Sequence, residues 1–175
     1  MKRTLTLVVL VVLVVVVVFV SSCKKNDPGQ NGPKVGDTAS GFTETDAAGN
    51  SFSLASVRGK VILFTISTMW CGPCRAEAPG LVEIYNTYKD SGLEIVQIIH
   101  QDEDGNPTDL EDINRWVTEY NIPFTVLMDP DYSTVDTYNP GGYPYNAVID
   151  RNFVIQYIGL GFDPDAIIQQ IEQYL

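Results

Sequence analysis

The chain has 175 residues, with 22 Asp or Glu against 11 Lys or Arg, and a formal net charge of −11 at pH 7. This length is sufficient for one domain with its own hydrophobic core. An acidic protein repels phosphate backbones and anionic headgroups, so the charge argues against nucleic acid and anionic membrane surfaces as partners.

The first 22 residues have the pattern of an export signal. A basic start is followed by an apolar run from Leu5 to Val20 and by two serines. The run is shorter than the roughly 20 residues that a membrane-spanning helix needs. We therefore predict a signal peptide over residues 1–22. A single transmembrane anchor is the alternative.

The next residue, Cys23, indicates a lipid anchor. Val20 to Cys23 reads VSSC, which resembles the lipobox of bacterial lipoprotein precursors. A chance cysteine beside a membrane segment is the alternative. Residues 23–36 are polar and rich in Gly, Pro and Asn, so we expect a flexible tether. Residues 37–175 would then form a domain in the bacterial cell envelope, outside the cytoplasm, where disulfides can form and persist.

Strand and helix patterns alternate along this domain. Runs of β-branched apolar residues predict buried strands, and apolar residues spaced by three and four predict helices. In chain order we expect two short strands within 42–54, a strand at 60–67, a helix at 74–88, a strand at 93–100, a helix at 109–120, a strand at 124–128, a hairpin from 145–150 and 153–159, and a helix from 163. This order predicts an α/β sandwich on a mixed sheet.

Two cysteines, Cys71 and Cys74, are the candidate reactive groups. A disulfide between them closes too small a loop to constrain the unfolded chain, so it would be a poor structural crosslink. A metal site needs about four ligands, and His100 is the only histidine. We therefore expect a redox-active dithiol with no metal and no cofactor. A structural disulfide or a metal site is the alternative.

The position of Cys71 favours its reactive form. It follows a predicted buried strand and stands where a helix begins, and there unpaired backbone N–H groups and the helix dipole stabilise a thiolate. Cys74 lies one helical turn further along. We expect Cys71 to attack a substrate disulfide and Cys74 to resolve the resulting mixed disulfide.

Four segments together resemble a known family. They are RGK at 58–60, WCGPCRAEAP at 70–79, INRWVTEYNIPFTVLMDP at 113–130 and GGYPYNAVID at 141–150. They resemble the membrane-tethered thioredoxin-like proteins of the TlpA/ResA type, extracytoplasmic thiol-disulfide oxidoreductases of bacteria, over nearly all of residues 36–175. The resemblance implies a three-layer α/β/α sandwich on a mixed sheet, with an N-terminal hairpin and a central helix-strand insertion.

The same resemblance implies an activity. Gly72 and Pro73 are the pair found between the cysteines of reducing thioredoxins. We therefore expect a reductant of protein disulfides that cycles through a Cys71–Cys74 disulfide. We also expect it to be a monomer that takes electrons from a membrane thiol donor.

One acidic residue is a candidate proton acceptor. Thioredoxins carry a buried aspartate six residues before the first active cysteine, and here Thr65 stands at that position. TlpA/ResA-like proteins have a glutamate where this chain has Glu77. Burial could raise the pKa of Glu77 toward neutrality, so that it accepts the proton of Cys74. A solvated first-turn glutamate that supports the helix dipole is an equal alternative.

Three residues are candidates for substrate binding. The resemblance implies a cis peptide bond at Pro144, facing the dithiol, and an ordinary trans proline is the alternative. Tyr143 would shape the substrate groove. Trp70 would shield the thiol and contact substrate, or else pack partly buried.

Two other functions remain open. Thr68 stands three residues before Cys71 and is similar to the Thr-x-x-Cys of peroxiredoxins, which suggests a thiol peroxidase. Phe64, however, stands where those proteins have a proline. A lipoprotein that uses the fold only to bind a partner is the non-enzymatic alternative.

Overall fold

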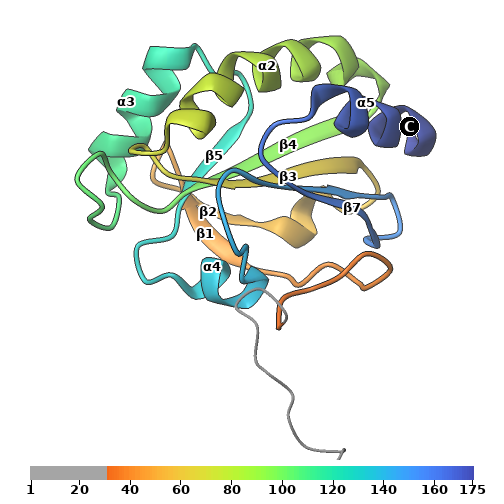
Figure 1. Cartoon of the computed structure of the whole chain (residues 1–175), viewed down its shortest axis with the longest axis horizontal. Coiled ribbons are helices and arrows are strands. Elements are labelled where there is room, and N and C mark those ends of the chain that lie inside the picture. The colour runs from red at the N-terminus through yellow and green to blue at the C-terminus, as the bar shows by residue number, and fades with distance from the viewer. Residues whose placement is uncertain (1–30) are drawn as a thin grey trace, which may run out of the picture.

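The computed structural model of the chain describes residues 31–175 (Figure 1). The predicted signal peptide, Cys23 and most of the predicted tether lie outside the described residues. Among the residues described, no helix has both the length and the apolar character needed to cross a membrane.

Seven strands form one mixed sheet in the order β2-β1-β5-β4-β3-β6-β7. Their bounds are β1 Thr43–Asp46, β2 Ser51–Ser53, β3 Val61–Ser67, β4 Leu93–Ile99, β5 Thr125–Met128, β6 Tyr145–Ile149 and β7 Ile155–Leu160. The central strands β3, β4 and β5 are parallel, and every other neighbouring pair is antiparallel. This is the expected mixed sheet, with the N-terminal hairpin β1–β2 at one edge.

Helices cover both faces of the sheet. Their bounds are η1 Leu54–Val57, α2 Gly72–Tyr88, η2 Lys89–Ser91, α3 Leu110–Tyr120, α4 Ser133–Tyr138 and α5 Pro164–Tyr174, where η marks a 3-10 helix. Helices α2, α3 and α5 lie along one face, and α4 lies on the opposite face (Figure 1). The thioredoxin-like three-layer arrangement is therefore confirmed.

The alternation of β3 divides the core into two parts. Val61 and Leu63 pack with the α2, α3 and α5 layer, whereas Ile62, Phe64 and Ile66 pack with α4 and η1. Successive side chains of a strand point to opposite faces, so an apolar run can serve both layers at once. All seven residues of β3 are buried, so the core holds this strand firmly. The strand ends four residues before Cys71.

The helix α4 was not predicted from the sequence. It has only six residues, and Tyr132 and Asn139 flank it with positive φ angles of 62° and 43°. Such a segment is too short to show a helical period, and its burial comes from the packing of Val135 and Tyr138 against the second half of the core. The other expected helices and strands are present, with ends that differ by a few residues.

Candidate active site

Cys71 forms the N-cap of α2. Its Sγ accepts a hydrogen bond from the backbone N–H of Cys74 at 3.4 Å, and its S–H donates to the backbone carbonyl of Tyr143 at 3.8 Å. The backbone is extended at Cys71 and helical after it, and Pro73 falls in the first turn, where its missing N–H has no helical partner to lose. The sequence thus folds so that Cys71 lies between a helix N-terminus and the loop before β6.

The two thiols differ in their surroundings. Both are free, but Cys71 retains 5% exposure whereas Cys74 is fully buried. Burial raises the pKa of the Cys74 thiol, and the hydrogen bond with Cys71 and the negative charge of Glu77 raise it further. A Cys74 thiolate therefore forms only if a nearby group takes its proton.

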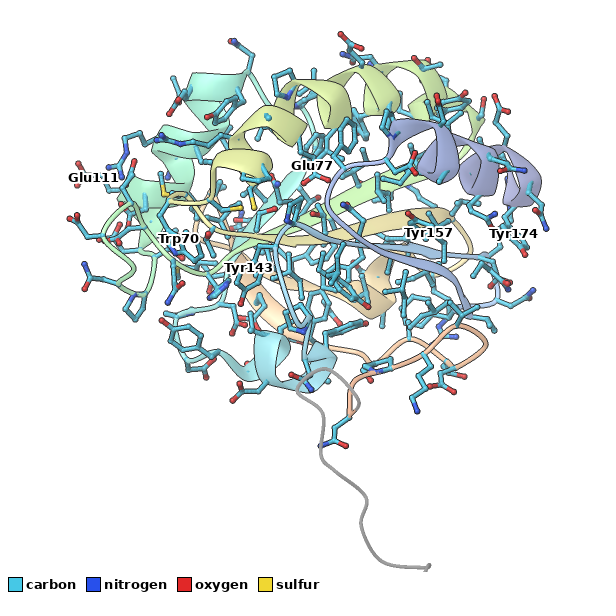
Figure 2. The ribbon with its side chains drawn as sticks, in the orientation of Figure 1. Trp70, Glu77, Glu111, Tyr143, Tyr157 and Tyr174 are labelled. Atoms are coloured by element: carbon cyan, nitrogen blue, oxygen red, sulfur yellow. The ribbon has the colours of Figure 1, made fainter. Side chains whose placement is uncertain are left out.

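Glu77 is fully buried, lying between α2 and the sheet (Figure 2). The interpretation as a solvated first-turn glutamate is therefore wrong. Burial raises the pKa of Glu77 to about 7, and the hydrogen bond that Asn146 Nδ2 donates to Glu77 Oε1 at 2.7 Å opposes this rise. A carboxyl group with this pKa can exchange a proton near neutral pH, which is the property required of a general base.

The peptide bond between Tyr143 and Pro144 is cis, as the family resemblance implied. Pro144 is buried and its carbonyl accepts a hydrogen bond from the N–H of Gly161 at 2.8 Å, which ties the loop to the end of β7. The carbonyl of Tyr143 is the acceptor for Cys71. The loop therefore presents backbone directly at the more accessible thiol.

Trp70 lies at the rim of this site. Its side chain is 48% exposed, and its ring meets that of Tyr143 edge to face at a centroid distance of 6.2 Å (Figure 2). The indole N–H donates to Gln101 Oε1 at 2.9 Å, which fixes the ring orientation. Leu160, 60% exposed, lies against Gly142 and adds apolar surface to the same loop, and the sequence did not identify it as a site residue.

His100 is buried close to the site but is not part of a ligand group. Its ring packs between Tyr132 and Tyr143, and burial lowers its pKa to about 4. Within residues 31–175, one group of three side chains could hold a metal ion. It consists of Glu44, Asp129 and Asp131 and includes neither His100 nor a cysteine.

Asn146 is a second residue of the site that the sequence analysis missed. It is fully buried on β6, and its Nδ2 donates both to Glu77 and to the carbonyl of Gly161, the latter at 3.1 Å. It pairs in register with Thr65 on β3, the position where thioredoxins carry their buried aspartate. A buried amide two residues beyond Pro144, in a strand that is otherwise mainly apolar, was the available signal.

Comparisons with known proteins identify relatives of this chain. The model of the AhpC/TSA family matches residues 35–158. The thiol-disulfide oxidoreductase ResA of Bacillus thuringiensis is 31% identical over 144 residues, covering 81% of this chain and 77% of that protein.

Solved structures show the same fold. A Chlorobium tepidum protein described as a thiol:disulfide interchange protein DsbE is 27% identical with a TM-score of 0.72, over 81% of this chain and 97% of that one. A Bacteroides thetaiotaomicron protein described as a protein disulfide isomerase is 26% identical with a TM-score of 0.71, over 81% and 90% of the respective chains.

Proposed function

The chain belongs to the AhpC/TSA family and is a thiol-disulfide oxidoreductase, and from this premise we propose that it is a membrane-tethered reductant of protein disulfides outside the cytoplasm. The observation that carries the proposal is the pairing of an N-cap thiol, Cys71, with a buried thiol, Cys74, beside a buried carboxyl group. The three groups are spaced three residues apart, from the N-cap of α2 into its second turn.

The reaction transfers two electrons in two thiol exchanges. The Cys71 thiolate attacks a substrate disulfide, a new S–S bond forms at Cys71, and one substrate thiolate leaves and is protonated by water. Cys74 then attacks Cys71 Sγ, the Cys71–Cys74 disulfide forms, and the second substrate thiolate leaves. A membrane dithiol donor would reduce the Cys71–Cys74 disulfide by the reverse exchanges.

Glu77 serves the second exchange in this proposal. Cys74 must lose its proton to attack, and burial makes its thiolate unfavourable. Glu77 takes that proton and can return it when the donor reduces Cys74 again. The pKa of Glu77, raised to about 7 by burial, suits a group that both accepts and returns a proton near neutral pH.

Substrate binding is assigned to the rim of Cys71. Trp70 and Tyr143 provide aromatic surface, Leu160 extends it, and the cis loop at Pro144 provides backbone for an extended protein segment. We propose that the protein acts on protein disulfides as a monomer.

The tether gives the first test. The apolar run and the VSSC motif support lipidation of Cys23 after removal of residues 1–22. A Cys23→Ala variant should lose incorporation of a fatty-acid probe and should remain unprocessed, while the domain still folds because residues 37–175 are unchanged. Unaltered probe incorporation would contradict the assignment, and a Cys71→Ala variant should label like the wild type.

The direction of electron flow is the second test. No basic residue lies in the first turn before Arg75, and Gly72-Pro73 separates the cysteines, so we expect a reduction potential closer to about −270 mV than to about −120 mV. Equilibration of the soluble domain with dithiothreitol and glutathione buffers measures it. A potential above about −150 mV with no reduction of a protein disulfide would indicate an oxidase. Rapid turnover of hydrogen peroxide would favour the peroxidase that Thr68 suggested.

A further inference from the structure

Glu77 and Asn146 form a buried pair that is incompletely hydrogen-bonded. The amide nitrogen of Asn146 and one oxygen of Glu77 are satisfied, because Asn146 Nδ2 donates to Glu77 Oε1 and to the Gly161 carbonyl. The two remaining oxygens of the pair, Glu77 Oε2 and Asn146 Oδ1, are buried without a hydrogen-bond partner in the described structure. Two orphan acceptors in one cluster are costly, because a buried polar atom without a partner loses its full hydration energy.

A single proton resolves both deficits. A carboxyl group that is protonated on Oε2 becomes a donor, and the nearby amide oxygen is an acceptor that lacks a donor. The two protons of Nδ2 are already assigned to Glu77 Oε1 and Gly161, so Oδ1 is the remaining atom of Asn146 that can interact with Glu77. An acid and a primary amide can pair in this way through two parallel hydrogen bonds.

We propose that Asn146 is the positioning residue that holds Glu77 in both of its protonation states. In the ionised state Nδ2 donates to Oε1, and in the protonated state Oδ1 also accepts from Oε2–H. This inference deepens the proposed function and rests on it, since it explains how a buried carboxyl group can accept the Cys74 proton without moving away from Cys74.

The surroundings leave Asn146 as the main polar control of Glu77. Glu77 has no ion-pair partner in the described residues, and on α2 it interacts electrostatically with Cys74. The facing positions on β3 and β6, Thr65 and Asn146, are neutral. On the β7 side the titratable groups are Tyr157, whose hydroxyl lies over Gly159, and Asp163 beyond it.

The position of Asn146 also connects proton transfer to the substrate loop. It pairs with Gly159 on β7, and its Nδ2 binds Gly161, whose own N–H binds the carbonyl of Pro144. The proton acceptor, the end of β7 and the cis loop are thus held by one amide. A displaced Asn146 would disturb both sites together.

Asn146→Leu tests the pair, because it keeps the branched shape of the side chain and removes both hydrogen bonds to Glu77. The variant leaves the buried carboxylate without a hydrogen-bond donor, and an unpartnered buried charge costs more than an unpartnered neutral acid, so the ionised state loses more. We expect the pKa of Glu77, measured by NMR titration of a ¹³C-labelled carboxyl group, to rise by about one unit. Resolution of a Cys71 mixed disulfide by Cys74 should then slow about tenfold below pH 7, with its pH profile displaced upward by the same amount.

Two further variants separate this proposal from the proposed function. In a Glu77→Gln background, Asn146→Leu should leave the pH profile of resolution unchanged, because the group that Asn146 controls is absent. Asn146→Asp should raise the pKa of Glu77 more than Asn146→Leu does, because two carboxyl groups then share one proton. An unshifted Glu77 titration in Asn146→Leu would overturn the pairing even if Glu77→Gln alone alters catalysis. A shifted titration with no effect of Glu77→Gln on resolution would uphold the pairing and reject Glu77 as the acceptor.

Discussion

A Cys74→Ala variant is expected to accumulate mixed disulfides with its substrates, whereas a Cys71→Ala variant is expected to accumulate almost none. Cys71 lies at the helix N-terminus under the carbonyl of Tyr143 and keeps some exposure, so it can reach an external disulfide. Cys74 is fully buried and can reach only Cys71. Both variants should lose turnover, to below about 1% of the wild-type reductase rate.

Non-reducing electrophoresis followed by mass spectrometry measures the trapped species. Species that vanish on addition of dithiothreitol, and that contain Cys71 joined to a substrate cysteine, are the expected result. The double variant should trap nothing and serves as the control for chance oxidation. Trapping through Cys74 in the Cys71→Ala variant would mean that the roles of the two thiols are exchanged.

The layers of the fold could be predicted because they depend on local patterns. Runs such as residues 60–67 are apolar on both faces, and the alternation of strand and helix patterns fixes an α/β class. The dithiol was equally accessible to sequence reasoning, since Cys71 precedes Pro73 at the junction of a strand and a helix. These features are decided by residues that lie close together in the chain.

The burial of Glu77, by contrast, could not be predicted from residues close to it in the chain. Buried positions recur along α2 every three or four residues, at Cys74, Glu77, Leu81 and Ile84. The helical period therefore does place Glu77 on the buried face. A charged side chain at such a position can be buried or can mark an exposed helix start. The difference depends on Asn146, which lies 69 residues further along the chain and reaches Glu77 only through the register of β6 against β3.

Glu77→Gln is expected to slow the resolution step about 10²-fold at pH 7 while leaving the first attack by Cys71 nearly unchanged. Gln keeps the shape of Glu77 and can still accept from Asn146 Nδ2, but it cannot take the Cys74 proton. Release of a coloured thiol from a Cys71 mixed disulfide, followed by stopped flow, measures this step. In the wild type the rate should rise as Glu77 ionises near pH 7, and this inflection should be absent from the variant.

The exposed Glu83, also on α2, provides the matched control. Glu83→Gln removes the same negative charge from the same helix without contacting the cysteines, so its rate and pH profile should match the wild type. An unchanged inflection in Glu77→Gln would remove the carboxyl group from the mechanism and leave its burial without a catalytic role.

Stability should change in the opposite direction to activity. Between its unfolded pKa of about 4.5 and its folded pKa of about 7, Glu77 is protonated in the folded protein and ionised in the unfolded chain. The folded state therefore binds the extra proton, and the free energy of unfolding decreases as pH rises through this window. Above pH 7 the loss reaches about 3 kcal/mol, because each unit of pKa difference is worth about 1.4 kcal/mol.

Glu77→Gln removes this loss, so urea unfolding should show a variant more stable than the wild type at pH 8 and little changed at pH 4.5. An equal effect at both pH values would contradict the raised pKa. The expected variant is therefore more stable and less active, because ionisation of the same buried carboxyl group costs stability and enables proton transfer.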